Sequence, residues 1–414
     1  MCKPVYWRRS AVSQELLEIE QIPLGNPRIK LFADFPWRLY RGDLCWTPPL
    51  RGDLLGNRFL GLVGLLTPQH PYHLHAEVTH FLAWRGKEPV GRISAAINHR
   101  FNDYHDTRIG FFGFFDVIED YEVAKALLDQ VQSWVKGYGM SVLRGPGEYS
   151  TATYERQGIL VDGFQHPPTM ELTHNHPYYS EFLDNYGFHK AKDYFAYTFD
   201  VQTSIPSRLK KLVDQVRIRR DIQTRPLNIK KLTDDVRLIA DIYNDSWTNN
   251  WGFLPITDVE AKAIADSLRL IVDPGLVRFA FIGGEPAAVL GAFPDPYYVL
   301  RPRWHWYGDS DLIRAARLLL MRRRIPDTRL MFFGIRPGFR QLGIDALLFY
   351  EAKEYGIQKG YSKCETSMLL EDNQLILRAS EFMGAKQYKT WRVYELLIEW
   401  IFVVANSSWQ LYIT

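Results

Sequence analysis

The turn between Met331 and Gly343 carries residues that could bind an anion. Its sequence, MFFGIRPGFRQLG, predicts a strand ending in a glycine-bearing turn, and the following IDALLFYEAKEYG has the apolar spacing of a helix. Free backbone N–H groups and the positive end of the helix dipole would then lie at Gly343, which suits a phosphate or pyrophosphate. Arg336 and Arg340 flank this position and could add charge-assisted hydrogen bonds.

The run Arg340-Gln341-Leu342-Gly343-Ile344 resembles the acyl-CoA motif of the GNAT N-acyltransferases, in which this loop cradles the CoA pyrophosphate. The resemblance implies that acyl-CoA or acetyl-CoA is the co-substrate, with no metal. It assigns cofactor binding to Phe333, Gly334, Ile335, Arg336, Arg340, Gln341, Leu342, Gly343, Ile344 and Asn373. The family pattern ends in glycine or alanine, where this chain has Asp345, whose carboxylate would compete with a bound pyrophosphate. An ordinary strand-to-helix turn is the alternative.

The reaction implied by the resemblance needs an amine made neutral and a proton for the leaving thiolate. Glu371 and Asp372 are candidate general bases, because they follow the predicted strand KCETSMLL at its carboxyl end. Capping of the next helix by Asp372 or Asn373 is the alternative. The tyrosine that the family places seven residues after the motif asparagine is Ser380 here, so Tyr388 is the substitute acid.

Two aromatic segments are candidates for binding the acceptor. Trp247, Asn250 and Trp251 lie in a loop between two predicted helices, in the region that borders the acceptor site of GNAT folds. His174 and Tyr178 lie in a segment rich in hydrogen-bonding side chains, where an acceptor-binding or proton-relay role competes with a plain helix start. No cysteine or acidic pair lies at metal-ligand spacing near them.

The chain contains two copies of one unit. The hairpin dipeptide Glu88-Pro89 recurs as Glu285-Pro286, and Gly187 recurs as Gly384 at the same offset. Gly113, Leu127 and Gly139 match Gly334, Leu348 and Gly360 at a second common offset. Such long repeats indicate duplicated domains and exclude a solenoid.

The repeat and the resemblance together predict an α/β fold (α+β, with a mixed sheet) of two tandem GNAT-like acyltransferase domains. Residues 1–200 would form the N-terminal domain, 201–227 a connector helix and 228–414 the C-terminal domain. The first copy has Glu122 where the second has Gly343, and a side chain there blocks backbone access. We therefore expect the second copy to bind acyl-CoA and the first to be a scaffold on the acceptor side.

The composition narrows the cellular setting. A net charge of +3 argues against nucleic-acid binding, and three scattered cysteines indicate a reduced, cytoplasmic protein without disulfides. No stretch has the apolar length of a spanning helix. The apolar run 54–66 and the basic amphipathic segment 301–329 leave peripheral contact at the inner membrane face open. The apolar tail 396–405 is of strand length.

These patterns favour an acyl-CoA-dependent N-acyltransferase acting on an amine, with a lipid or other large acceptor preferred. The resemblance extends to tandem GNAT proteins, some of whose relatives, including bacterial ceramide synthases, acylate long-chain lipid amines. Two alternatives stay open: a non-catalytic CoA- or ligand-binding protein on a degenerate GNAT scaffold, and a transferase that uses aminoacyl-tRNA. The acceptor, the acyl length and the oligomeric state are left open by the sequence.

Overall fold

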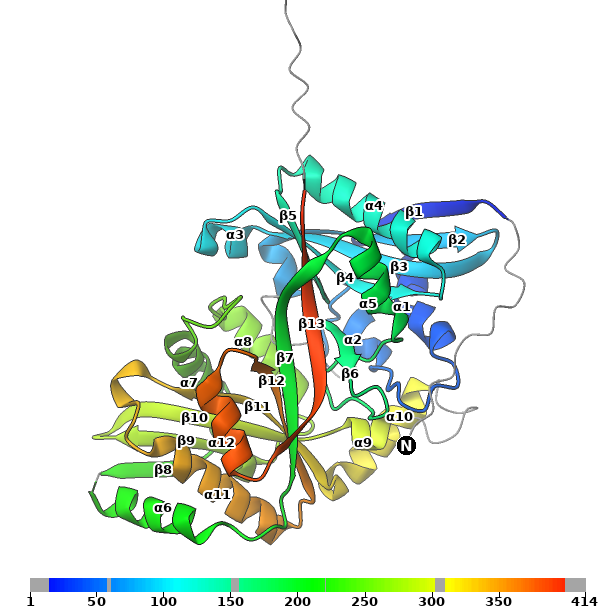
Figure 1. The fold of residues 1–414 in the computed structure, drawn as a ribbon. Coiled ribbons are helices and arrows are strands. Elements are labelled where there is room, and N and C mark those ends of the chain that lie inside the picture. Colours follow the sequence, from blue (N-terminus) through cyan, green and yellow to red (C-terminus); the bar gives the residue numbers. More distant parts are fainter. Residues whose placement is uncertain (1–14, 58–60, 150–155, 220, 302–309, 399–414) are drawn as a thin grey trace, which may run out of the picture.

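The computed structural model describes residues 15–57, 61–149, 156–219, 221–301 and 310–398 (Figure 1). The first half contains β1 (Leu17–Pro23), α1 (Ile29–Leu39), α2 (Arg51–Leu55), η1 (Pro71–Leu74), β2 (Ala76–Arg85), β3 (Glu88–Asn98), α3 (His99–His105), β4 (Ile109–Val117), α4 (Tyr121–Gly137), β5 (Val142–Gly147), β6 (Ile159–Asp162), α5 (Tyr178–Tyr186) and β7 (His189–Asp200). The second half contains α6 (Ser207–Arg219), β8 (Ile222–Pro226), η2 (Ile229–Lys231), α7 (Leu232–Ser246), α8 (Asp258–Leu268), η3 (Pro274–Leu276), β9 (Val277–Ile282), β10 (Glu285–Pro294), α9 (Tyr297–Leu300), α10 (Asp311–Met321), η4 (Arg322–Arg324), β11 (Asp327–Ile335), η5 (Pro337–Phe339), α11 (Ile344–Lys359), β12 (Lys363–Leu370), α12 (Gln374–Phe382) and β13 (Lys386–Leu397).

One mixed sheet of 13 strands runs through both halves in the order β1-β2-β3-β4-β5-β13-β7-β12-β11-β10-β9-β8, with β6 paired to β13. The hairpin turns at Glu88 and Glu285 join β2 to β3 and β9 to β10. Gly187 and Gly384 follow α5 and α12 with φ values of 106° and 82°, a conformation that glycine adopts without strain. The repeated order of elements confirms the predicted α/β duplication.

The last strands of the two halves are exchanged at the centre of the sheet (Figure 1). β13 of the second half pairs with β5 of the first, and β7 of the first half lies between β13 and β12. Trp391 and Val393 on β13 are fully buried in this region. Each half therefore completes its sheet with a strand from the other half.

The segment 201–227 departs from the expected connector helix. Helix α6 ends at Arg219, and β8 then pairs antiparallel with β9, so the second unit begins before residue 228. The basic residues in this segment suggested one continuous helix. Arg225 instead forms an ion pair with Asp235 at 2.7 Å and lies over the ring of Phe279, which ties the strand to the core.

Helices cover both faces of the sheet in the first half. The buried side chains of α4 recur at helical spacing (Val123, Leu127, Val131 and Val135) and pack on β2, β3 and β4. Helix α1 contacts the same strands, and successive residues of β3, Ala95 and Ala96, belong to two different apolar clusters. Because side chains alternate along a strand, the two helices lie on opposite faces.

Two apolar segments singled out in the sequence lie partly outside the described residues. In the run 54–66, residues 58–60 are not described; Leu54 and Leu66 are buried, whereas Val63 is exposed. In the tail 396–405, Leu396 and Leu397 end β13 and residues 399–405 are not described. Within the described ranges, no helix is both long enough and apolar enough to cross a bilayer.

Candidate active site

In the first half, strands β4 and β5 diverge after their paired segment, and this leaves a gap in the sheet. They pair in parallel from Ile109 to Gly113 on β4 and from Val142 to Gly147 on β5. A Cβ atom on Gly113 would lie 2.1 Å from the carbonyl oxygen of Glu148, so glycine permits this close approach. Phe114 follows with a φ of 47°, which bends β4 away from β5. Side chains beyond this point face a cavity.

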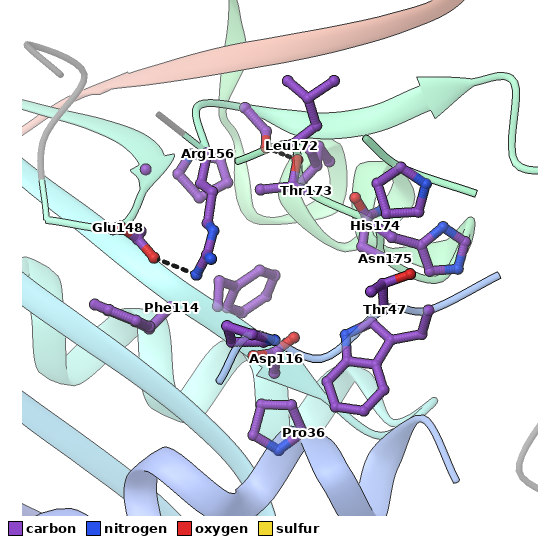
Figure 2. A pocket seen from close by; sticks show the side chains of 18 of the residues that line it. Pro36, Thr47, Phe114, Asp116, Glu148, Arg156, Leu172, Thr173, His174 and Asn175 are labelled. Atoms are coloured by element: carbon purple, nitrogen blue, oxygen red, sulfur yellow. Dashed lines mark hydrogen bonds and ion pairs between the residues drawn. The ribbon is translucent and has the colours of Figure 1, made fainter. Parts of the chain in front are cut away.

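The first chamber of that cavity has a volume of about 110 Å³ and reaches from the strand gap to the loop after α1. Figure 2 shows the Glu148–Arg156 ion pair at one end and His174 with Thr47 at the other. Asp116 of β4 also lines it. The chamber therefore lies where the gap between β4 and β5 exposes the interior of the first half.

A buried histidine–aspartate pair stands at the far end of the first chamber. His174 Nε2 lies 3.1 Å from Asp43 Oδ2, and the two side chains are 5% and 2% exposed. Burial lowers the pKa of His174 although Asp43 opposes this effect, and the ring is therefore neutral near pH 7. With the proton on Nε2 and donated to Asp43, Nδ1 is left as a hydrogen-bond acceptor.

Three polar atoms of side chains lining the first chamber have no hydrogen-bond partner within the described residues. They are Trp37 Nε1, Thr47 Oγ1 and His174 Nδ1. An unsatisfied buried polar group costs about 1–3 kcal/mol, so such atoms in a chamber mark a place for water or a polar ligand. The three offer two donors and one acceptor.

The second chamber, of about 300 Å³, lies between the two halves. Its walls come from residues 50–54, 61–65 and 70–75 of the first half and from α8, α9 and α10 of the second. The apolar part of the lining includes Leu62, Val63, Ile264, Leu268, Ile271 and Leu318. Leu54, Glu148, Arg156 and Tyr297 line both chambers and so mark where the chambers meet.

Three carboxyl groups surround one arginine at this junction. Arg156 contacts Glu148 at 2.7 Å and Glu171 at 3.2 Å, and its Nη2 donates to the hydroxyl of Tyr297 at 3.2 Å. Asp53 completes the group on the second-chamber side. Arg156 is the guanidinium that contacts these carboxyl groups, and the charges of Arg92 and Arg314 also act on Glu148 and Asp53.

Burial raises the pKa of Asp53 to about 7, and the nearby Glu171 carboxylate adds to this while Arg156 opposes it. Burial also raises the pKa of Glu148. Arg156 and Glu171 have φ values of 46° and 58°, which are strained for residues with a side chain. Strain and shifted pKa values concentrate at functional sites, so the junction is the strongest candidate for chemistry among the described residues.

The predicted pyrophosphate turn is present, but both of its arginines and the Phe333 carbonyl already have protein partners. Arg336 pairs with Asp245 at 2.7 Å, and Arg340 donates to the carbonyl oxygen of Ser246 at 2.9 Å. Trp247 Nε1 donates to the Phe333 carbonyl, which the family resemblance assigns to the pantetheine arm. Gly343 caps α11 with a φ of 80°, and Asp345 stands exposed in the first helical turn. Cofactor binding at Phe333–Ile344 stays a prediction.

The predicted catalytic residues of the second half lie apart from the chambers. Glu371 pairs with Lys190 at 2.6 Å and Asp372 with Lys192 at 2.8 Å. The hydrogen bond from Lys192 lowers the pKa of Asp372, which makes it a weaker base. Tyr388 is buried against Glu365, and this burial raises its pKa. The structure does not bring these groups to one reacting centre.

The helix-cap alternative is confirmed for Asn373, whose side-chain oxygen accepts the Ile376 N–H of α12. Asn250 lies in the turn after α7, where its N–H donates to the Trp247 carbonyl. Trp251 reaches the first half, where Arg144 of β5 lies 4.7 Å from its ring centre. Tyr178 donates to the Val117 carbonyl at the end of β4 and does not line either chamber.

Of the predicted acceptor-side residues, His174 lines a chamber, and the residues at the junction were missed. Asp53, Glu171 and Tyr297 lie in loops or at a helix start, where no periodic pattern marks a role. Glu148 had a signal, because it follows β5 at its carboxyl end, the position at which α/β folds place ligands. Among the described residues no group of three or more metal-ligating side chains could hold a metal ion.

No protein-family model matches the chain. It is 30% identical over 392 residues to the bacterial ceramide synthase of Caulobacter vibrioides (strain NA1000 / CB15N), covering 91% of this chain and 97% of that protein. It is 28% identical over 403 residues to Protein YghO of Escherichia coli (strain K12), covering 95% and 99%. Among solved structures, a tandem GNAT protein from the clavulanic acid biosynthesis pathway matches with a TM-score of 0.52 at 11% identity, over 93% of this chain and 99% of that one.

Proposed function

The chain belongs to the family of the bacterial ceramide synthase and YghO and has the tandem GNAT fold, and from this premise we propose that it transfers the acyl group of an acyl-CoA to the nitrogen of a long-chain amine. The family and fold make the chain an acyltransferase. What we propose beyond this is that the donor is an acyl-CoA, that the acceptor atom is a nitrogen and that the acceptor carries a long hydrocarbon chain. One observation carries it: an apolar chamber of about 300 Å³ ends at a cluster of carboxyl groups.

The second chamber has the properties expected of a site for an amine with a hydrocarbon tail. Its apolar wall would bury the tail, at about 25 cal/mol for each Å² removed from water. The carboxyl groups of Asp53, Glu148 and Glu171 would attract the ammonium end, and Arg156 holds two of them in place. A small polar amine would leave the apolar wall unfilled. The chamber therefore favours a lipid-like acceptor.

The first chamber would receive the thioester end of the donor. The unpartnered Trp37 Nε1 and Thr47 Oγ1 can donate hydrogen bonds to carbonyl oxygens, and His174 Nδ1 can accept one from an amide N–H. The amide-bearing arm of an acyl-CoA offers both kinds of group. Because the chambers meet at Glu148 and Arg156, the thioester carbon and the amine nitrogen would come together there.

Asp53 is the proposed general base. A carboxyl group with a pKa of about 7 accepts a proton from a nearby ammonium far better than an ordinary aspartate. The neutral nitrogen then attacks the thioester carbon, so that a C–N bond forms and the C–S bond breaks. Of the two protons lost by the nitrogen, the first goes to Asp53 and the second to the leaving thiolate. The products are an amide and free CoA.

The test is an incubation of the purified protein with acyl-CoAs of different lengths and a panel of short- and long-chain amines, analysed by mass spectrometry. We expect an N-acyl product with long-chain amines. Asp53→Asn should lower the rate by about 10²- to 10⁴-fold, the usual contribution of a general base. Asp103→Asn changes an exposed carboxylate on α3 and serves as the matched control.

Three results would contradict the proposal in different ways. Binding of acyl-CoA without any product would favour a non-catalytic binding protein. Product formed from aminoacyl-tRNA but not from acyl-CoA would favour the tRNA-dependent alternative. Full activity of Asp53→Asn, with activity lost in Glu371→Gln, would return the reacting centre to the second half.

A further inference from the structure

Helix α10 presents an apolar stripe to solvent. Leu312 and Leu320 are each 82% exposed, and Ile313 and Leu319 are 51% and 48% exposed. These positions are spaced by one, seven and eight residues, which places them on one face of a helix. Single exposed apolar residues are common on protein surfaces, but four on one helical face mark a contact surface.

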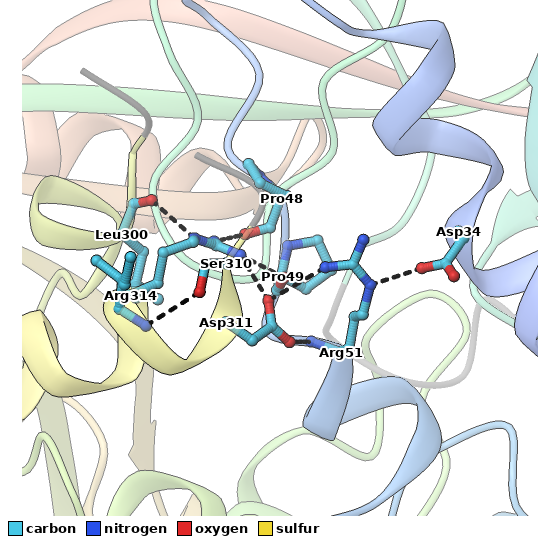
Figure 3. Close-up of polar contacts among 9 residues, drawn as sticks. Asp34, Pro48, Pro49, Arg51, Leu300, Ser310, Asp311 and Arg314 are labelled. Carbon is cyan, nitrogen blue, oxygen red and sulfur yellow. Dashed lines mark hydrogen bonds and ion pairs between the residues drawn. The ribbon is translucent and has the colours of Figure 1, made fainter. Parts of the chain in front are cut away.

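The opposite face of α10 is fixed to the first half, so the stripe cannot turn inward (Figure 3). Arg314 is 2% exposed and donates to the carbonyl oxygens of Pro48, Pro49 and Leu300. Asp311 accepts the backbone N–H of Arg51 at 2.6 Å. The helix is therefore held by polar contacts on one side and left apolar on the other.

Basic residues follow the stripe directly. The 3₁₀ helix η4 consists of Arg322, Arg323 and Arg324, and the last two are exposed. Among the described residues, no carboxylate forms an ion pair with Arg323 or Arg324. An apolar stripe bordered by free guanidinium groups is complementary to an interface that is apolar inside and negatively charged at its surface.

The same helix borders the second chamber. Leu318, on the inner side of α10, lines the chamber. Arg322 Nη1 donates to the carbonyl oxygen of Leu270, another lining residue, at 3.2 Å. The width of α10 thus separates the exposed stripe from an apolar space inside the protein.

We propose that Leu312, Ile313, Leu319 and Leu320, with Arg323 and Arg324, form a docking face for the surface of an anionic phospholipid bilayer. The apolar side chains insert at the boundary between headgroups and acyl chains, and the arginines bind lipid phosphates. Docking there places the second chamber next to the bilayer. The inference concerns membrane binding and requires no part of the proposed reaction.

The test is flotation of the full-length protein with vesicles, in the absence of any acyl donor or amine. Vesicles of phosphatidylcholine alone are compared with vesicles that also contain phosphatidylglycerol. We expect binding to the anionic vesicles, and a loss of about tenfold in Leu312→Ser/Leu320→Ser and in Arg323→Glu/Arg324→Glu. Leu375→Ser/Arg378→Glu changes an exposed leucine and arginine on α12 and is the matched control, with binding unchanged.

The possible results distinguish a docking face for anionic membranes from a dimer interface. Binding that is equal for phosphatidylcholine and anionic vesicles, or unchanged in both α10 variants, would overturn the proposal. Absence of vesicle binding together with a dimer that the Leu312→Ser/Leu320→Ser variant abolishes in sedimentation would assign the stripe to a second copy of the chain. Circular dichroism of each variant confirms that a loss of binding is not a loss of fold.

Discussion

The environment of Asp53 sets its chemistry. Its carboxyl group lines the open second chamber, and desolvation by the chamber walls raises its pKa to about 7 although the residue as a whole is exposed. The Glu171 carboxylate acts in the same direction, whereas Arg156, Arg314 and a hydrogen bond from the Leu50 backbone oppose it. Near neutral pH the group is close to half-ionised. An ammonium ion arriving in the chamber would lower the pKa again and favour the carboxylate.

This shift predicts the pH dependence of the reaction. The ionised form of Asp53 accepts the proton, so kcat/KM should rise as the pH increases through about 7 and then level off. Asp53→Asn should lose this ascending limb as well as most of the rate. The measurement is a pH–rate profile from pH 5 to 9, roughly the range over which this titration is complete.

Stability provides an independent check on the same pKa. The pKa of Asp53 in the folded state lies above its ordinary value of 3.8. The unfolded state therefore loses its proton first, and this residue's contribution to stability is lost as the pH rises through about 7. Relative to Asp53→Asn, the wild type should become less stable as the pH rises from 3.8 to about 7. An ascending rate limb that persists in the variant would transfer the role of base to Glu148 or His174.

At the scale of elements, helix α6 packs against the turn that resembles a pyrophosphate site. Val213 and Val216 of α6 pack against Leu347 and Tyr350 of α11. A Cβ atom placed on Gly343 would lie 2.6 Å from Val216 Cγ2. Glycine at this position thus serves two purposes: it adopts the φ of 80° without strain, and its lack of a side chain leaves room for Val216 of α6. Either purpose explains the residue without a bound phosphate.

Gly343→Ala should therefore lower the free energy of unfolding by about 1–3 kcal/mol, through left-handed strain and the contact with Val216. In the double variant with Val216→Ala the contact is relieved and the strain is not, so a double-mutant cycle should give a favourable coupling of about 1 kcal/mol. Urea denaturation measures both values.

Gly338→Ala is the matched control in the same turn, because its Cβ would meet nothing within 4 Å. It should change stability by less than about 1 kcal/mol. If Gly343→Ala is as stable as the control but binds CoA less tightly, the glycine is kept for the cofactor, and the prediction made from the sequence regains its support.

At the scale of the whole molecule, strand exchange joins the two halves into one structure. The pairing of β13 with β5 and of β7 with β12 means that neither half has a complete sheet without the other. The second chamber lies between the halves, and the buried Arg314 ties α10 to residues 48 and 49. We infer that the two copies unfold together.

Leu127 of α4 and Leu348 of α11 are equivalent in the repeat, and both are fully buried. Substituting either by alanine should cost about 2–5 kcal/mol. Each variant should lower the midpoint of one common unfolding transition, and hydrogen exchange should accelerate in β3 and β10 alike. Two separable transitions, each sensitive to only one variant, would show that the halves are independent.

The local pattern of the sequence was sufficient to predict the helices, strands and boundaries of the repeated unit. Turn residues at Glu88 and Glu285, and glycines at 187 and 384, mark the same boundaries in both copies. Apolar spacing over 121–137 predicts α4 because the helical period is visible in a short window. The motif at Gly343 located a strand, a turn and a helix correctly. The resemblance then identified the fold.

The candidate site could be predicted less well from the sequence, because the roles of its polar groups depend on partners that are distant in the chain. Asp372 and Glu371 carry the right chemistry, yet lysines of β7 neutralise them, a consequence of the strand exchange. Arg336 and Arg340 have the right charge, yet neighbouring elements already accept their hydrogen bonds. Among the carboxyl groups at the junction of the chambers, Glu148 is the one that directly follows the carboxyl end of a strand.

By itself, the sequence determined the duplicated α/β unit, because it is encoded in short-range periodicity and repeat spacing, and the resemblance of Arg340–Ile344 to the GNAT motif implied the acyltransferase family. The tertiary structure decided where the first chamber lies, because the gap between β4 and β5 is seen only when the sheet is assembled. It also decided which carboxyl groups meet, since Asp53 lies on α2 whereas Glu148 and Glu171 lie in two separate loops. The physical reason is that burial, and with it the pKa of a carboxyl group, is a property of the packed chamber and not of the residue.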